Sequence, residues 1–91
     1  MQQLIESIGK YLLAVVSPLI QSPQTAELRV AQSEDGKMLR VRLLLEQGDV
    51  ARVIGRNGMT ASAIRSLAKA AGDKRGIKVV VHILSRQEVE I

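Results

Sequence analysis

Two glycines, Gly55 and Gly58, lie three positions apart and enclose Arg56 and Asn57. Neither glycine carries a Cβ, so an extended ligand can press against the backbone, and both can adopt angles closed to other residues. Arg56 adds a cation, and Asn57 adds an amide donor and tolerance of left-handed angles. This combination favours contact with a phosphodiester backbone. It is also compatible with an ordinary helix–helix turn, because G-x-x-G is common by chance.

The residues around this loop strengthen the first interpretation. A helix that begins just after Gly58 would expose unpaired N–H groups and a partial positive charge at its N-terminus. Val53 and Ile54 would line an aliphatic groove in which bases settle by van der Waals contact. Tyr11 is the only aromatic residue, so a stacking platform for single strands cannot be built. A G-x-x-G clamp on about four nucleotides does not need one.

The charge of the chain is unevenly distributed. The 91 residues carry a net charge of +4, with five basic and six acidic side chains over residues 1–49. Residues 50–78 hold seven basic side chains and one acidic one. Positive charge is therefore concentrated around the glycine pair, and an anionic partner, nucleic acid first, is expected. The same count would result if these lysines and arginines only kept a helix soluble.

Apolar periodicity predicts three helices and three strands in one domain over residues 1–91. They are, in order, a helix over 3–20, strands over 26–32 and 38–46, a short helix over 47–54, a longer helix over 59–71 and a strand over 77–84. We expect a two-layer α+β domain in which the helices cover the apolar face of the sheet. The tail after residue 84 either extends the last strand or frays.

Single residues set the expected helix ends. Pro18 should end or kink the first helix near Ser17. Asp49 is expected to cap the short helix, and Gly72 to cap the C-terminus of the longer one. The buried stripe of that longer helix is predicted to consist of Ile64, Leu67, Ala68 and Ala71.

Residues that could support catalysis are missing. The chain has no cysteine, and its only histidine, His82, lies in an apolar strand without a second acid–base group or metal ligand. Neither of the glycine-rich nucleotide-binding patterns occurs. We therefore expect no enzyme activity, no cofactor, no metal and no small-molecule substrate. Apolar runs fall far short of the ~20 residues of a membrane span, and the N-terminus does not resemble a signal peptide.

At this point the sequence resembles a KH domain, the single-stranded nucleic-acid binding module. The order helix-strand-strand-helix-helix-strand is similar to the type II, bacterial version, which has a three-stranded mixed sheet. The stretch "VIGRNG…AIRSLA" and the "SPLI" near the end of the first helix resemble the small, single-KH-domain KhpA-like family. The likeness covers residues 3–84.

The resemblance implies specific roles for residues. Gly55 to Gly58 would clamp the RNA backbone, Val53 and Ile54 would form the groove wall, and Arg52 and Arg65 would neighbour phosphates. It further implies a cytoplasmic RNA chaperone or post-transcriptional regulator that forms a homodimer or a heterodimer with another KH protein. Met59 departs from the family pattern, where a basic residue often follows the second glycine.

Two alternatives remain open. Met59 and the helix corner could serve a KH-shaped protein-interaction module with little RNA binding of its own. Alternatively, residues 59–71 could be the recognition helix of a helix-turn-helix DNA reader. The DNA reader fits less well, because the preceding helix is very short and this segment offers few polar residues for base contacts.

Overall fold

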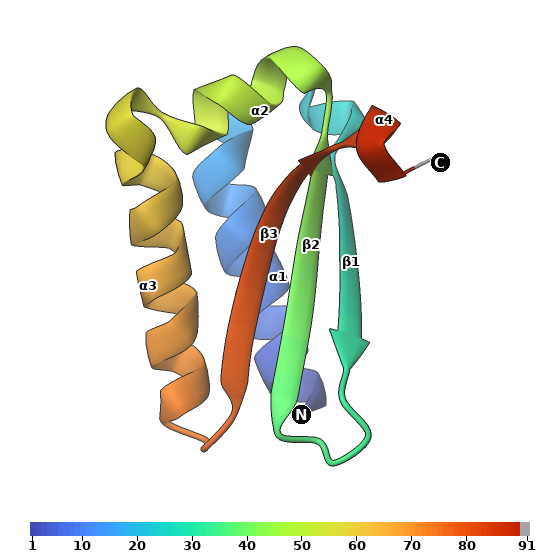
Figure 1. The fold of residues 1–91 in the computed structure, drawn as a ribbon, viewed down its shortest axis with the longest axis vertical. Helices are drawn as coiled ribbons and strands as arrows, with labels where there is room; N and C mark the ends of the chain where they lie inside the picture. Colours follow the sequence, from blue (N-terminus) through green and yellow to red (C-terminus); the bar gives the residue numbers. More distant parts are fainter. Residues whose placement is uncertain (90–91) are drawn as a thin grey trace.

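The computed structural model describes residues 1–89 and contains one three-stranded sheet with helices on one side (Figure 1). The elements are α1 (Gln2–Val16), the 3-10 turns η1 (Ser17–Leu19) and η2 (Pro23–Thr25), β1 (Glu27–Gln32), β2 (Met38–Leu45), α2 (Gln47–Ile54), η3 (Arg56–Gly58), α3 (Met59–Asp73), β3 (Lys78–Ser85) and α4 (Arg86–Val89). The predicted α+β architecture with the order α-β-β-α-α-β is confirmed.

The sheet is mixed, with the order β1-β2-β3. β1 pairs antiparallel with β2 through the hairpin, and β3 returns parallel to β2 after the α2–α3 crossover. Figure 1 looks onto the face that is turned away from α1, with α3 running beside β3 and α2 across one end of the sheet. β3 is therefore an edge strand whose outer edge faces α3.

Aliphatic side chains build the whole core between the sheet and the helices. One face of β2 contributes Leu39, Val41, Leu43 and Leu45, all buried as the alternation of the strand predicts. α1 contributes Leu4, Ile8, Leu12 and Val16, which recur every four residues. α2 adds Val53, and α3 adds Ala61, Ile64 and Ala68. The helices on which the glycine loop depends are thus anchored in the core.

The ends of α1 and α3 differ in how well they were predicted. α1 ends at Val16 and continues as a 3-10 turn around Pro18, close to the predicted end or kink near Ser17. The prediction that Gly72 is a C-cap is wrong, because Gly72 lies buried inside α3, which ends at Asp73. A Cβ at Gly72 would collide with the Ile77 carbonyl oxygen and the Val79 side chain. Close approach of α3 to β3 therefore explains this glycine.

Three further expectations need correction. Asp49 does not cap α2, because Glu46 holds the N-cap position and Asp49 lies in the first turn. Leu67 does not belong to the buried stripe of α3, since it is 57% exposed. The tail neither extends β3 nor frays at once, because Arg86–Val89 form the short helix α4. Residues 90–91 lie outside the described part of the chain.

We predict that Gly72→Ala destabilises the domain although it adds a better helix former. The new methyl group must displace the backbone of Ile77, and overpacking of this kind costs about 1–3 kcal/mol. Urea unfolding followed by circular dichroism measures the change. Gly48→Ala is the matched control, because a Cβ at Gly48 meets only the flexible end of Arg52 at 3.4 Å. Equal midpoints for the two variants would contradict the close-packing explanation.

Candidate nucleic-acid interface

The backbone between α2 and α3 turns sharply because three of its four loop residues have positive φ angles. Gly55 has φ 75° and ψ 178°, Asn57 has φ 57° and ψ 22°, and Gly58 has φ 72° and ψ 14°. The Gly55 conformation is accessible essentially to glycine alone, whereas asparagine tolerates the left-handed region. A hydrogen bond of 3.2 Å from the Gly58 N–H to the Gly55 carbonyl closes the turn.

The two glycines of the loop serve different purposes. A Cβ at Gly55 would lie 2.6 Å from the Thr60 hydroxyl oxygen, so this glycine lets α3 begin directly above the loop. A Cβ at Gly58 would meet no atom within 4 Å. The backbone of Gly58 is therefore bare and open on the outside of the corner, where a ligand can approach it.

The side chains on the outside of the corner are exposed. Arg56, Asn57 and Met59 all project to solvent, and Met59 is 70% exposed, so it does not fold back onto the molecule. Gly58 is the N-cap of α3, and no side chain accepts the first N–H groups of this helix. The corner thus presents a guanidinium, an amide and the positive end of a helix in one place.

The predicted groove wall is divided between the core and the surface. Val53 is fully buried and supports α2 from below, so it offers no surface to a ligand. Ile54, the last residue of α2, is 38% exposed next to Gly55. Of the two residues predicted to line a groove, only Ile54 can therefore contact a ligand directly.

The two arginines predicted as phosphate neighbours point in different directions. Arg52 donates to the Gly48 carbonyl oxygen at 2.9 Å and pairs with Asp49 at 3.2 Å, so its side chain points back along α2, away from the loop. Arg65 lies two turns further along α3 and donates from Nε to the Val81 carbonyl oxygen at 3.2 Å. The structure therefore brings Arg65, and not Arg52, to the surface between α3 and β3.

This surface is a cleft of about 370 Å³ between α3 and the edge strand β3. Arg65 and Lys69 form one wall, and Val79–His82 form the other. Of the residues that line this cleft, only Arg65 was predicted from the sequence as a ligand contact. Lys69, Val80 and His82 were missed, although the alternation of residues 77–84 already separates Val80 and His82 from the buried side of the strand.

A buried carboxylate holds the start of α2 in place. Asp49 is 2% exposed and accepts hydrogen bonds from the backbone N–H groups of Gln21 and Ser22 at 3.0 and 3.1 Å. The Gln21 hydrogen bond is the main cause that lowers the pKa of Asp49, assisted by Ser22 and Arg52 and opposed by burial. Asp49 thus fixes α2, and with it the loop, to the segment between α1 and β1.

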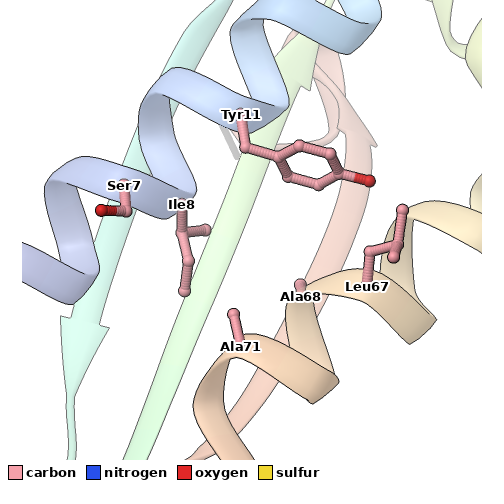
Figure 2. Close-up of a pocket in the computed structure, with 6 residues that line it drawn as sticks. All are labelled: Ser7, Ile8, Tyr11, Leu67, Ala68 and Ala71. Carbon is pink, nitrogen blue, oxygen red and sulfur yellow. The ribbon is translucent and has the colours of Figure 1, made fainter. Parts of the chain in front are cut away.

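A separate apolar groove of about 320 Å³ lies between α1 and α3. Ser7, Ile8 and Tyr11 of α1 face Leu67, Ala68 and Ala71 of α3, and Figure 2 shows the Tyr11 ring extending toward Leu67. The exposed Leu67 forms one rim of this groove. It lies away from the glycine corner and was not predicted from the sequence.

The order of elements, the mixed sheet and the G-x-x-G corner between two helices define a type II KH domain. A family model described as KhpA/KhpB, KH domain, matches residues 9–83. The chain belongs to this KhpA/KhpB family of KH domains. No helix in residues 1–89 combines the length and apolar character that crossing a bilayer requires.

Curated relatives agree with this assignment. The RNA-binding protein KhpA of Streptococcus pneumoniae serotype 4 is 38% identical over 63 residues, which cover 69% of this chain and 77% of the relative. The RNA-binding protein KhpA of Bacillus subtilis is 36% identical over 69 residues, covering 76% and 83%. The RNA-binding protein KhpA of Leifsonia xyli is 39% identical over 67 residues, covering 74% and 86%.

We predict that Asp49→Asn lowers the melting temperature most at neutral pH. Because the folded state lowers the pKa of Asp49, its stabilisation is complete above the unfolded pKa of about 3.9 and is lost as the pH falls through the lower folded pKa. The difference in melting temperature between parent and variant should therefore shrink from pH 7 toward pH 2. Thermal unfolding across this pH range measures it.

Asp73→Asn is the matched control for this experiment. Asp73 forms an exposed ion pair with Lys69 at 3.0 Å, and such pairs contribute little to stability. Its melting temperature should stay within about 3 °C of the parent at every pH. A difference for Asp49→Asn that is the same at pH 7 and pH 2 would show that its charge does not stabilise the fold.

Proposed function

We propose that this chain is a non-catalytic protein that binds single-stranded RNA across the Gly55–Gly58 corner. The observation that carries this proposal is the bare backbone of Gly58, which is flanked by the exposed Arg56 and Asn57 and by the N-terminus of α3. The Gly58 and Met59 N–H groups are used within the turn, where they donate to the Gly55 and Arg56 carbonyl oxygens. The corner therefore offers a phosphate oxygen the Arg56 cation, the Asn57 amide and the positive end of α3. A loop of this shape clamps about four nucleotides in KH domains.

The bases of the clamped nucleotides would lie along the α3–β3 cleft. The Lys78 N–H donates to the Lys37 carbonyl on the β2 side, so the next peptide groups alternate, and those of Val79 and Val81 turn toward α3. Arg65 already donates to the Val81 carbonyl oxygen, which supports this orientation. Backbone groups and aliphatic walls can then contact bases without aromatic stacking.

The names of the relatives add support for RNA as the partner, since each is an RNA-binding protein. A short clamp without aromatic rings binds with modest affinity and little base stacking. This suits a cytoplasmic RNA chaperone or post-transcriptional regulator, which holds and releases many RNAs, better than an enzyme that must position one reacting bond.

A second candidate function is pairing with another copy of the chain or with another KH protein. The α1–α3 groove favours it, because it is apolar and because Leu67 is exposed at its rim. The groove is separate from the glycine corner, so pairing there leaves RNA binding undisturbed. Two clamps joined in this way would gain avidity for one RNA.

We predict that replacing both Arg56 and Asn57 by aspartate reduces RNA affinity about 100-fold or more. The change removes a cation and an amide donor and adds two charges that repel phosphates. Aspartate tolerates the left-handed angles at position 57, so the fold should persist. Fluorescence anisotropy with a labelled 12-nucleotide single-stranded RNA measures binding, and log affinity of the parent should fall with log salt at roughly 0.7 per neutralised phosphate.

The matched control is Gln3→Asp with Lys10→Asp, two exposed positions on α1. Lys→Asp and Gln→Asp lower the net charge by as much as the two loop substitutions do, so the control separates local contacts from overall charge. If the loop variant binds RNA as tightly as the parent, the proposed clamp is wrong. A preference of the parent for duplex DNA over single strands would instead favour the helix-turn-helix alternative.

We predict that Leu67→Lys disrupts self-association without affecting the binding of an RNA too short to span two clamps. A lysine at the rim places a charge against the apolar α1–α3 groove, and burying it between two copies is unfavourable. Analytical ultracentrifugation should show a dimer for the parent and a monomer for the variant. Leu13→Lys, at a leucine 40% exposed outside the groove, should remain dimeric. A parent protein that stays monomeric at about 100 times the concentration used in the anisotropy assay would exclude this pairing.

A further inference from the structure

The sheet face opposite the helices carries an arginine cluster that the proposed clamp does not use. Side chains of alternate residues point to this outer face, and its exposed members that can donate to an anion are Arg29, Arg40, Arg42, Lys78 and His82. We call these five residues the outer basic face. They come from all three strands, so the structure gathers charges that are far apart in the sequence.

The register of the sheet lines up three of these side chains in one row. Arg29 lies directly opposite Arg42, and Arg42 lies directly beside His82. Like charges in directly opposite cross-strand positions are destabilising. Only Arg29 has an ion-pair partner within the described residues, Glu27 at 2.9 Å, whereas Arg42 has none there. An anion lying along this row would remove the repulsion.

The next row adds a depression suited to a base. Ala31 lies opposite Arg40, and with Gln32, Ser33 and Met38 they line a hollow of about 130 Å³ at the hairpin end of the outer face. The small Ala31 side chain leaves the space, Met38 supplies an apolar floor, and Arg40 supplies a guanidinium on which a base can stack. The surface therefore combines cations that can contact phosphates with room for the flat ring of a base.

One end of the outer face is closed and the other is open. The closed end is the row of Glu27, Leu44 and Leu84, where Leu44 is buried although it lies outside the main core. Arg86 reaches from the end of β3 to the Glu27 carboxylate at 3.1 Å, so α4 begins across this row (Figure 1). The basic rows lie on the open part of the sheet.

The outer basic face is continuous with the α3–β3 cleft. Val80 and His82 line that cleft, and the same two side chains belong to the rows of Arg40 and Arg42. A strand that leaves the cleft over the β3 edge therefore reaches these arginines directly. This continuity favours one polymer, an RNA longer than the clamped segment, over a separate acidic partner.

We propose that single-stranded RNA leaving the α3–β3 cleft crosses the β3 edge and binds the outer basic face. This proposal rests on the proposed function, because it extends the path of the clamped strand. Phosphates lie along the row of His82, Arg42 and Arg29, and a base occupies the hollow beside Arg40. The footprint on RNA is then longer than the roughly four nucleotides held by the loop.

Affinity as a function of RNA length tests the extended path. Fluorescence anisotropy measures the affinities for a 5-nucleotide and a 12-nucleotide RNA of one repeated base. Because the longer RNA offers the clamp more positions, each affinity is divided by the number of positions, or registers, at which the clamp can bind. The parent should bind the longer RNA about tenfold more tightly per register. Arg40→Gln with Arg42→Gln should abolish this gain and reduce the salt slope for the 12-mer by about 1.4, while 5-mer binding stays within twofold.

Controls separate this proposal from the function on which it rests. Lys10→Glu lowers the net charge by the same two units and should leave the gain with length unchanged. The loop variant with Asp at positions 56 and 57 should lose both RNAs. If only the loop variant has an effect, the clamp holds and the extended path is wrong; if only the outer-face variant has one, the clamp is wrong.

Amide chemical shifts locate the contact even if a variant does not fold. The 12-mer should shift the amide signals of Arg29, Ala31 and Arg40 in the parent protein, and the 5-mer should leave them unchanged. If both RNAs shift only the loop and cleft residues, the extended path is excluded. If poly-L-glutamate shifts the outer-face signals and the 12-mer does not, the face binds acidic protein and the proposal is overturned.

Discussion

The interface depends on a backbone that takes positive φ angles at Gly55, Asn57 and Gly58 while both adjoining helices are fixed in the core. Asp49 ties α2 to the α1–β1 segment, and Ile64 holds α3 against the sheet. The corner therefore cannot relax by moving either helix. This geometry requires a glycine at position 55, since a Cβ there would collide with Thr60, whereas the bare outer side belongs to Gly58.

The aliphatic composition constrains how such a corner can bind RNA. With Tyr11 as the only aromatic residue, and placed in the α1–α3 groove, stacking on rings contributes nothing at the corner. Binding must come from phosphate contacts, backbone hydrogen bonds and van der Waals packing, and phosphate contacts are weakened by salt. Affinity can then rise only through more contacts, which favours a longer RNA path or a second joined clamp.

Local patterns were sufficient to predict the helices α1, α2 and α3 and the three strands, but they did not predict α4 or the contacts between residues distant in sequence. Period-two alternation alone separates the exposed Arg40 and Arg42 from the buried residues of β2. The partners of Asp49, Gln21 and Ser22, are 28 and 27 residues away, so the residue was mistaken for a helix cap. Leu67 was assigned to the core because helical spacing fixes its side of α3 only roughly, while the width of the covered stripe depends on α1.

The same distinction explains why the sequence indicated the positive charge around the glycine loop but not the basic face of the sheet. Counting along the chain gave residues 1–49 no excess of positive charge, because Arg29, Arg40 and Arg42 are balanced there by acidic residues. In space these arginines meet His82 through the parallel pairing of β2 with β3, a register set by the α2–α3 crossover. Sequence counts average over both faces of a strand, whereas a polyanion contacts only one of them. The positive charge is therefore more concentrated on the face that a ligand meets than the net charge of the chain indicates.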